Sequence, residues 1–437
     1  RVYLTNSLEE YHPDTGTLFA SWLSSEANEA NHIKRDTPVM CIIGNPPYSV
    51  ESANKGEWIM KLMEDYKKEP GGKEKLKERN PKNINADEYK FIRYGQHFID
   101  KNGSGVLAFI NPHGFLDNPT FRGMRWNLLK TFDKIYVLDL HGNNKKKETA
   151  PDGSADVNVF DIEQGVSINV FIKTGKKKTS ELGRIFHYDL YGKREKKYEF
   201  LTLNSFKTIL FKELAHTPPM YYMVPKNFEG VGYYNKGFQV NSLFTKNTSG
   251  IKTHRDAFVI DFDKNDLENR IFSFYNLEIK NENILSTYDL KASNEWLNDK
   301  RKGLFDVHAV RKINYRPFDN RWIYYSNNLI DRGRENIFNT TIDIENVGLL
   351  TCRQLSTFDF QHVFITNLLT DMCSVSLQTK ETGYYFPLYI SSINPKTLLY
   401  DISGRTPNLN PEIVGQIAEG LRLTFTAEQA PAAGPLA

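Results

Sequence analysis

A short apolar run followed by two prolines is the feature that most constrains how this chain can fold. Val39 to Ile43 is unbroken and apolar, which is typical of a strand buried on both faces. Gly44 ends the run, and Pro46 and Pro47 then fix the backbone and keep the preceding residues out of a helix. Residues that follow such a strand lie at the carboxyl end of a sheet, where open α/β sheets bind ligands. The sequence therefore predicts a ligand site directly after Ile43.

The side chains of this turn suit a flat amine. Asn45 presents a side-chain oxygen, Pro46 a carbonyl of fixed direction, and Tyr48 an aromatic face. Two acceptors can take both hydrogens of an amino group, and the ring can stack on a planar base. The turn predicts a pocket for a heteroaromatic amine such as adenine. The alternative is an ordinary strand-to-loop turn.

The stretch Asn45-Pro46-Pro47-Tyr48 resembles the Asn-Pro-Pro-Tyr motif of the DNA methyltransferases that modify amino groups. In that family the Asn side chain and the first Pro carbonyl bind the target amino group, and the Tyr stacks on the extruded base. The resemblance implies that these four residues are catalytic, that S-adenosyl-L-methionine is the cofactor, and that N6 of a flipped adenine is methylated. The same motif occurs in methyltransferases of protein glutamine, so the motif alone leaves both substrates open.

Strands and helices are predicted to alternate along the first half of the chain. The predicted elements are a strand at 1–8, a helix at 17–35, a strand at 39–43, helices at 58–66 and 87–101, a strand at 106–110, a helix at 119–132, and strands at 134–140 and 167–172. This order is typical of the second half of a doubly wound sheet whose last two strands pair as an antiparallel edge. It also fits the methyltransferase resemblance. The predicted fold class is α/β, a Rossmann-like class I methyltransferase sheet, followed by a mixed α+β target-recognition domain.

The methyltransferase resemblance extends to two further residues. Asn6 ends the first predicted strand, where that family has a residue in contact with the adenine of the cofactor, so Asn6 and Asn45 are implied as cofactor-binding. Phe160 lies where the family has an aromatic that flanks the flipped base, beside Tyr48. The alternatives are a strand-end cap for Asn6 and a core residue at a hairpin start for Phe160.

Two longer segments, 142–168 and 313–325, resemble type ISP-like single-chain restriction–modification enzymes. Those enzymes carry nuclease, helicase, methyltransferase and target-recognition parts in one polypeptide, so we expect this chain to be joined covalently to upstream segments of that kind. The glycine-rich loop by which the methyltransferases bind their cofactor has no counterpart before Val39. We therefore expect an N-terminally truncated methyltransferase with its recognition domain. The alternative is a catalytically silent DNA-recognition fragment.

Basic residues among aromatic or glycine- and asparagine-rich neighbours predict double-stranded DNA as the partner. A lysine run in a loop is expected to contact phosphates, and arginines among aromatics are expected to read base edges. The candidates are Lys145, Lys146, Lys147, Arg316, Arg321, Arg332 and Arg334. A solvated loop and Arg–aromatic packing in a core are the alternatives for these two groups.

Composition and a change of pattern near Tyr198 give the predicted domains. Alternation fades there, so we predict a methyltransferase domain at 1–197, a recognition domain at 198–425 and a disordered tail at 426–437. The formal net charge of +3 does not itself prove nucleic-acid binding. No apolar run reaches the length of a membrane span, and the three widely spaced cysteines suggest neither a disulfide framework nor a metal site. These features favour a cytoplasmic protein without a metal.

Overall fold

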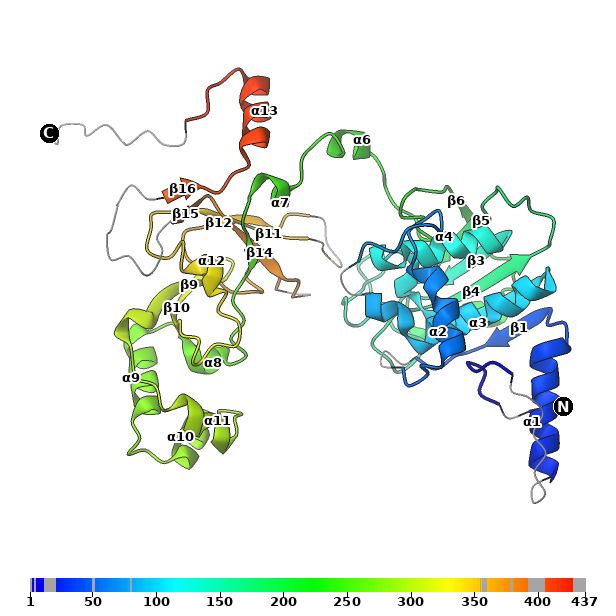
Figure 1. Ribbon diagram of the computed structural model, residues 1–437, viewed down its shortest axis with the longest axis horizontal. Coiled ribbons are helices and arrows are strands. Elements are labelled where there is room, and N and C mark those ends of the chain that lie inside the picture. The colour runs from blue at the N-terminus through cyan, green and yellow to red at the C-terminus, as the bar shows by residue number, and fades with distance from the viewer. Residues whose placement is uncertain are drawn as a thin grey trace. The chain divides into compact units, whose positions relative to one another are not determined.

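The computed structural model is a mixed α/β structure that divides into two compact units, Arg1–Phe228 and Glu229–Ala437 (Figure 1). It describes residues 2–3, 5–11, 21–48, 52–78, 81–353, 355, 360–377, 380–391 and 405–426. Residues 427–437 of the predicted tail lie outside the described part. Among the described residues, every helix is too short or too polar to span a lipid bilayer.

The first unit is built around a six-stranded sheet with the strand order β1-β2-β4-β3-β5-β6. The strands are β1 Cys41–Gly44, β2 Gly105–Pro112, β3 Lys134–Asp139, β4 Val166–Lys173, β5 Arg184–Asp189 and β6 Lys212–Leu214. Four strands, β1, β2, β3 and β5, run in the same direction, and β4 and β6 run against them. The loops that follow these four strands therefore leave the sheet at the same end, where the carboxyl ends of the four strands lie.

The predicted antiparallel pairing of the strands near 134–140 and 167–172 is confirmed as β3 with β4. Their predicted place at the sheet edge is wrong. β4 also pairs antiparallel with β2, so it lies inside the sheet, and β5 and β6 extend the sheet beyond β3. Alternating apolar residues indicate that a segment forms a strand. They do not indicate which other strands will pair with it.

Helices cover both faces of this sheet. The helices of the first unit are α1 Ser21–Asp36, α2 Glu57–Met63, α3 Asp87–Asn102, α4 Arg122–Thr131 and α5 Arg194–Leu203, and its 3₁₀ turns are η1 Glu64–Lys67, η2 Pro81–Asn85, η3 His113–Leu116 and η4 Pro119–Phe121. Apolar residues of α2, α3 and α4 share one buried core with Leu107 and Val137 of the sheet, and the three helices lie together in Figure 1. Phe200 and Leu201 of α5 pack instead with Leu138 in a second core. The predicted helices at 58–66, 87–101 and 119–132 are thus confirmed, while residues 17–20 of the first predicted helix lie outside the described part.

Two predictions about the start of the chain are wrong. No strand forms among the described residues of 1–8. The strand predicted at 39–43 forms as β1, but it is not buried on both faces, because the side chain of Ile43 is 77% exposed and Cys41 is exposed. The reason is the position of β1 at the end of the strand order, where, among the described residues, it pairs with β2 alone.

The predicted boundary at 197/198 falls inside the first unit. Residues 194–203 form α5, whose Lys197 is fully buried, and β6 joins the sheet by pairing with β5. Met223 is buried in the same core as β2 and β3. The first compact unit therefore extends past the predicted boundary, to Phe228.

The second unit is a mixed arrangement of short helices around two four-stranded sheets, with orders β13-β9-β10-β8 and β12-β11-β14-β7, and a two-stranded sheet β15-β16. Its strands are β7 Thr248–Ser249, β8 Ile260–Asp261, β9 Val310–Arg316, β10 Asp319–Tyr324, β11 Gly348–Cys352, β12 Val363–Thr366, β13 Leu369–Thr370, β14 Gly383–Pro387, β15 Tyr389–Ser391 and β16 Arg405–Pro407. Its helices are α6 Val231–Tyr234, α7 Val240–Leu243, α8 Asp256–Val259, α9 Lys264–Tyr275, α10 Asn281–Thr287, α11 Asn294–Lys300, η5 Val307–Ala309, α12 Glu335–Phe338 and α13 Pro411–Leu421.

One core spans both larger sheets of this unit and includes Ile313 of β9, Leu350 of β11 and Phe274 of α9. The last helix, α13, begins directly after Asn410, whose side chain caps it by accepting a hydrogen bond of 3.0 Å from the backbone N–H of Glu412. The second unit therefore has a core of its own that is independent of the first sheet.

Candidate functional site

The Asn-Pro-Pro-Tyr turn follows β1 directly and lies at the end of the sheet where β2, β3 and β5 also have their carboxyl ends. Asn45 is exposed, Pro46 is buried and Tyr48 is half-buried. The hydroxyl group of Tyr48 lies 3.0 Å from Oδ1 of Asn45 and 3.2 Å from the backbone oxygen of Ile110, so its one proton is shared between two acceptors. Burial, together with the negative charge of Glu88, raises the pKa of Tyr48 to about 12. Tyr48 is therefore a neutral donor that fixes the turn against β2.

Phe160 reaches the same place from a loop far along the chain. Its ring centroid lies 6.5 Å from that of Tyr48, at an interplanar angle of 54°. Asn158 shapes the loop, because its side-chain oxygen accepts from the Phe160 N–H at 2.9 Å while its amide group donates to the carbonyls of Gly142 and Gln164. The structure thus brings together the two residues predicted to stack on a base, Tyr48 and Phe160.

Asn111 is a further polar residue at this end of the sheet, and it is not among the predicted site residues. It follows Ile110 in β2, it is completely buried, and neither its amide nitrogen nor its amide oxygen has a hydrogen-bond partner among the described residues. A buried amide without partners is costly, by about 1–3 kcal/mol for each unsatisfied group. Such a group next to the Tyr48 contact suits a site that a polar ligand or water completes.

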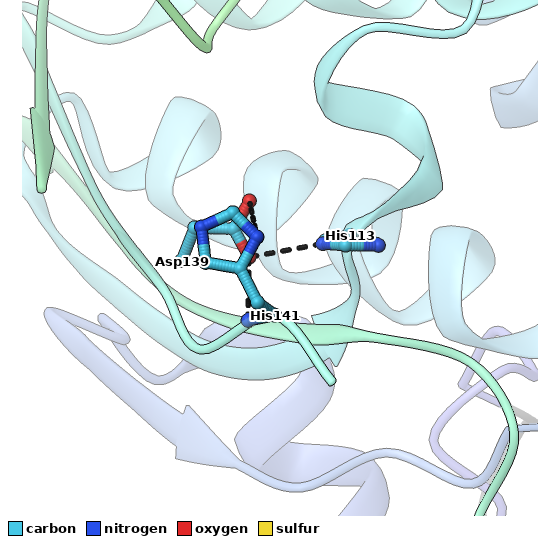
Figure 2. Close-up of side chains that lie close together, drawn as sticks. All are labelled: His113, Asp139 and His141. Atoms are coloured by element: carbon cyan, nitrogen blue, oxygen red, sulfur yellow. Dashed lines mark hydrogen bonds and ion pairs between the residues drawn. The ribbon is translucent and has the colours of Figure 1, made fainter. Parts of the chain in front are cut away.

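A cluster of histidines and carboxylates lies where β2, β3 and β5 end, and Figure 2 shows its centre. Nδ1 of His113 lies 2.9 Å from Oδ1 of Asp139, and the same carboxylate oxygen accepts from the backbone N–H of His141 at 3.0 Å. The ring of His141 lies 2.9 Å from Glu148 through Nδ1 and 2.8 Å from Asp189 through Nε2. The cluster therefore ties the ends of neighbouring strands to the loop that begins at Gly142.

The charge of His141 follows from these contacts. Burial alone lowers the pKa of a histidine, but the hydrogen bonds to Asp189 and Glu148 raise the pKa of His141 to about 10. An imidazole that donates from both ring nitrogens carries a positive charge and has no lone pair left. Oxygen and nitrogen atoms of His113, Asp139 and His141 lie within 4.8 Å of one another, as in a metal site. With both His141 nitrogens engaged, the arrangement fits an ion-pair network better than a cation site.

Two of the loop residues predicted to act through charge or amide groups, Asn6 and Lys145, have local side-chain partners. Asn6 uses its side chain within its own loop, accepting from the Leu8 N–H at 3.0 Å and donating to Glu9 at 3.0 Å. This geometry is that of a local cap, the alternative to its predicted role as a cofactor-binding residue. Lys145 forms an exposed ion pair of 3.1 Å with Glu163. Lys146 is half-buried and Lys147 is exposed.

Two of the predicted DNA-reading arginines belong to one hairpin of the second unit, formed by β9 and β10. The guanidinium of Arg316 lies 3.7 Å from the ring centroid of Tyr315, and that of Arg321 lies 4.3 Å from the same ring. Each also has a carboxylate partner, Asp371 at 2.6 Å for Arg316 and Asp319 at 2.8 Å for Arg321. The structure brings these two arginines together, in ion pairs and on one aromatic ring.

Arg332 and Arg334 lie on the loop between β10 and α12 and differ in exposure. The Arg332 side chain is 57% exposed and lies 3.4 Å from Asp331, whereas Arg334 is half-buried in a left-handed backbone conformation. The backbone of Arg332 pairs with that of Lys252. Lys252, Arg316 and Asp371 line an open pocket of about 350 Å³, so the loop of Arg332 runs beside the pocket of Arg316.

Comparison with known proteins gives one family match. Residues 242–430 match the family model of the Type ISP C-terminal specificity domain. No curated protein matches the chain.

Three solved structures resemble nearly the whole chain. The ATP-dependent Type ISP restriction-modification enzyme LlaBIII bound to DNA has a TM-score of 0.66 and 22% identity over 95% of this chain and 28% of that one. The DrdV–DNA complex has a TM-score of 0.63 and 20% identity over 92% of this chain and 40% of that one. A nuclease-deletion mutant of the Type ISP enzyme LlaGI in complex with a DNA substrate mimic has a TM-score of 0.62 and 20% identity over 96% and 34%.

This chain therefore spans between 28% and 40% of the length of the chains that it resembles. At these identities the likeness shows a shared fold, and the second unit carries the match to the Type ISP C-terminal specificity domain.

Proposed function

We propose that this chain is the modification and sequence-recognition part of a single-chain restriction–modification enzyme. In this proposal the first unit binds a flipped adenine in double-stranded DNA and takes part in methylation of its N6 amino group, and the second unit selects the DNA sequence. The observation that carries the proposal is the grouping of Asn45, Tyr48 and Phe160 at one sheet edge, although Phe160 is distant in sequence.

The geometry suits an aromatic amine. Asn45 is exposed, so its side-chain oxygen can accept a hydrogen from the amino group while it also receives the Tyr48 hydroxyl. The Pro46 carbonyl is the second acceptor that the resemblance implies. Two acceptors draw the nitrogen toward a tetrahedral geometry, which frees its lone pair for attack and stabilises the transition state electrostatically. Tyr48 and Phe160 offset the cost of extruding the base by stacking, at about 1–3 kcal/mol each.

S-adenosyl-L-methionine, when bound, supplies the methyl group for this reaction. Of the two residues expected to hold it, Asn45 is exposed at the sheet edge, but the amide of Asn6 is already used by Leu8 and Glu9. The described residues thus fit the target side of the pocket better than the cofactor side. We propose that the cofactor side is completed by another segment of the full polypeptide, as the restriction–modification resemblance implies.

The second unit supports the DNA part of the proposal. It contains the specificity-domain match, and its hairpin holds Arg316 and Arg321 with their guanidinium groups on a tyrosine ring. The similar structures are complexes with DNA or with a DNA substrate mimic. A pocket that admits one base cannot read a longer site, so a separate reader of base edges is needed.

The test is an exchange of the second unit in the full-length protein. Residues 229–426 are replaced by the corresponding region of a relative that modifies another site, and the methylated adenines are mapped by sequencing of modified DNA. We expect the hybrid to methylate the donor's site and not the original one. Methylation of the original site by a folded hybrid would show that sequence choice lies elsewhere.

A recognition fragment without catalysis is the second candidate, and the engaged side chain of Asn6 favours it. It predicts that the full-length protein binds a specific DNA sequence but leaves every adenine unmodified in the presence of S-adenosyl-L-methionine. Methylation of a glutamine-containing protein in place of DNA would support the third candidate, a protein-glutamine methyltransferase. The same labelled-methyl assay, run on DNA and on protein, distinguishes all three.

A further inference from the structure

The tip of the β9–β10 hairpin carries a phenylalanine in an unusual state. Phe318 is 94% exposed and its backbone has a φ of 62°, in the left-handed region. Bulky residues rarely adopt this conformation. The tip is formed by Pro317 and Phe318 between two strands whose ends pair Arg316 with Asp319. This order, proline first and positive φ second, is that of a type II turn, whose second position favours glycine or asparagine.

The chain therefore holds a large apolar ring in water at a position where a glycine would relieve strain. Backbone strain of this kind persists only when the surrounding structure imposes it, and it concentrates at functional sites. The stem of the hairpin is firmly held. Ile313 and Ile323 are fully buried in the core of the second unit, and Arg321 pairs with Asp319 immediately after the tip. A rigid stem carries an exposed ring at its end.

Charged groups of both signs lie near the base of this tip. Arg316 directly precedes the turn, pairs with Asp371 at 2.6 Å, and lines an open pocket of about 350 Å³. The other charged or titratable residues that line this pocket are Lys252, His254, Asp256, Asp371 and Lys380. An apolar ring at the tip of a hairpin whose strands carry Arg316 and Arg321 matches duplex DNA, whose phosphates are anionic and whose base steps are apolar. DNA-bending and base-extruding proteins insert such rings as wedges between base pairs.

Resting on the proposed function, we infer that Phe318 is a wedge that inserts between base pairs of the bound DNA, with Arg316 beside it. This residue belongs to the reading unit and is separate from the Tyr48 and Phe160 pair in the first unit. The ring gains stacking with bases that it lacks in the unbound protein, where, among the described residues, it lies edge-on to Phe364 at a centroid distance of 6.1 Å. A second copy of this chain or another protein partner is the competing occupant.

The experiment uses the full-length protein and two variants, Phe318→Gly and Phe318→Asn. Both replacements accept a positive φ, so the melting temperature should stay the same or rise. The probe is the duplex enriched by the wild-type protein from a pool of random duplexes. We expect both variants to bind this duplex about tenfold to a hundredfold more weakly, the effect of losing one stacked aromatic. Because Phe318 is uncharged, the salt dependence of binding should not change.

A second readout reports the wedge itself. 2-Aminopurine placed at successive positions of the duplex becomes more fluorescent where a base step is unstacked, and we expect one bright position with wild-type protein that disappears in both variants. Phe272→Ala is the matched control, because Phe272 is another exposed phenylalanine of this unit, 62% exposed, outside the hairpin. It should leave affinity and fluorescence unchanged.

Three results would overturn the wedge. Unchanged affinity and fluorescence in the folded variants would remove it while leaving the proposed function intact. Loss of self-association in the variants, with DNA affinity preserved, would assign the tip to a protein interface instead. If the wild-type protein enriches no duplex at all, the proposed function fails, and the wedge fails with it.

Discussion

The candidate residues of the two units lie in different kinds of side-chain environment. In the first unit the candidate residues are fixed by neighbours from distant segments, as Tyr48 is by the carbonyl of Ile110, and the ends of the strands are held by buried ion pairs around His141. In the second unit the candidate arginines are partly exposed and paired with carboxylates, as Arg321 is with Asp319. Chemistry on one atom needs fixed groups, whereas reading a DNA surface needs groups that can exchange partners.

The largest effect is expected from a substitution at Asn45. Asn45→Ala in the full-length protein should lower the rate of adenine methylation by about 10²–10³-fold, because a preorganised acceptor in the transition state is lost. Binding of the target duplex should change little, since phosphate and groove contacts remain. Asn45→Asp, which keeps an acceptor oxygen, should retain more activity than the alanine variant. Near-normal methylation by Asn45→Ala would exclude Asn45 from the chemistry.

The buried network predicts a stability effect in the first unit. His141→Phe should destabilise that unit by about 3 kcal/mol, because it leaves carboxylates buried without their cation. The groups that face His141 are Asp139, Glu148, Asp189, His113 and Tyr191, and His187 contacts the same Asp189 carboxylate. The measurement is urea unfolding followed by circular dichroism. His32→Phe is the matched control, because the side chain of His32 is 64% exposed, and it should have little effect.

The same network predicts how stability depends on pH. The pKa of His141 is raised to about 10 in the folded state, above its ordinary value of 6.5. Its contribution to the free energy of unfolding should therefore be fully present below about pH 6.5 and lost as the pH rises toward 10. The difference in stability between wild type and His141→Phe should shrink over that range. A difference that stays constant from pH 6.5 to 10 would show that His141 is not held as a cation.

Stacking by Tyr48 predicts a smaller effect that depends on the DNA. Tyr48→Ala should weaken binding of a duplex with a paired target adenine by about 1–3 kcal/mol. The loss should be smaller for a duplex with a mismatched target, because that base is already easier to extrude. Tyr48→Phe separates the ring from the hydroxyl and should keep the affinity. Equal losses on both duplexes would argue against stacking on an extruded base.

Arg332 tests whether the second unit reads sequence. Arg332→Ala should cost about 1–3 kcal/mol of binding and relax the preference at one base pair. Arg184→Ala in the first unit is the matched control, because its side chain is 56% exposed against 57% for Arg332 and each lies beside one carboxylate. Selection from random duplexes measures both variants. An unchanged preference profile for Arg332→Ala would remove this arginine from the reader.

The smallest effect is expected at Lys145 in the first unit. Lys145→Ala should weaken binding similarly for all duplexes and reduce the slope of log affinity against log salt by about 1, as one phosphate contact is lost. Titrations at several salt concentrations give that slope. Lys77→Ala is the control, because Lys77 is also exposed, at 76%, and also pairs with a glutamate. If both variants give the wild-type slope, Lys145 is a solvated loop residue.

The amino-acid sequence alone determined the local elements and the most informative turn. Apolar patterns located β2, β3, β4, α3 and α4, because these signals act within one element. The prolines after Gly44 fixed the backbone of the candidate site for the same local reason. The predicted pairing of Tyr48 with Phe160 came from the family resemblance, and the structure places the two rings near each other.

Only the tertiary structure decided which elements are neighbours. It inserted β4 between β2 and β3, left β1 at an edge, and kept residues 198–228 in the first unit. It also gathered His113, Asp139, His141 and Asp189 from the ends of separate strands. Alternation of apolar residues reports burial along one strand, but pairing across a sheet and ion pairs between distant loops depend on how the strands are ordered, and a pattern local to each segment does not contain that order.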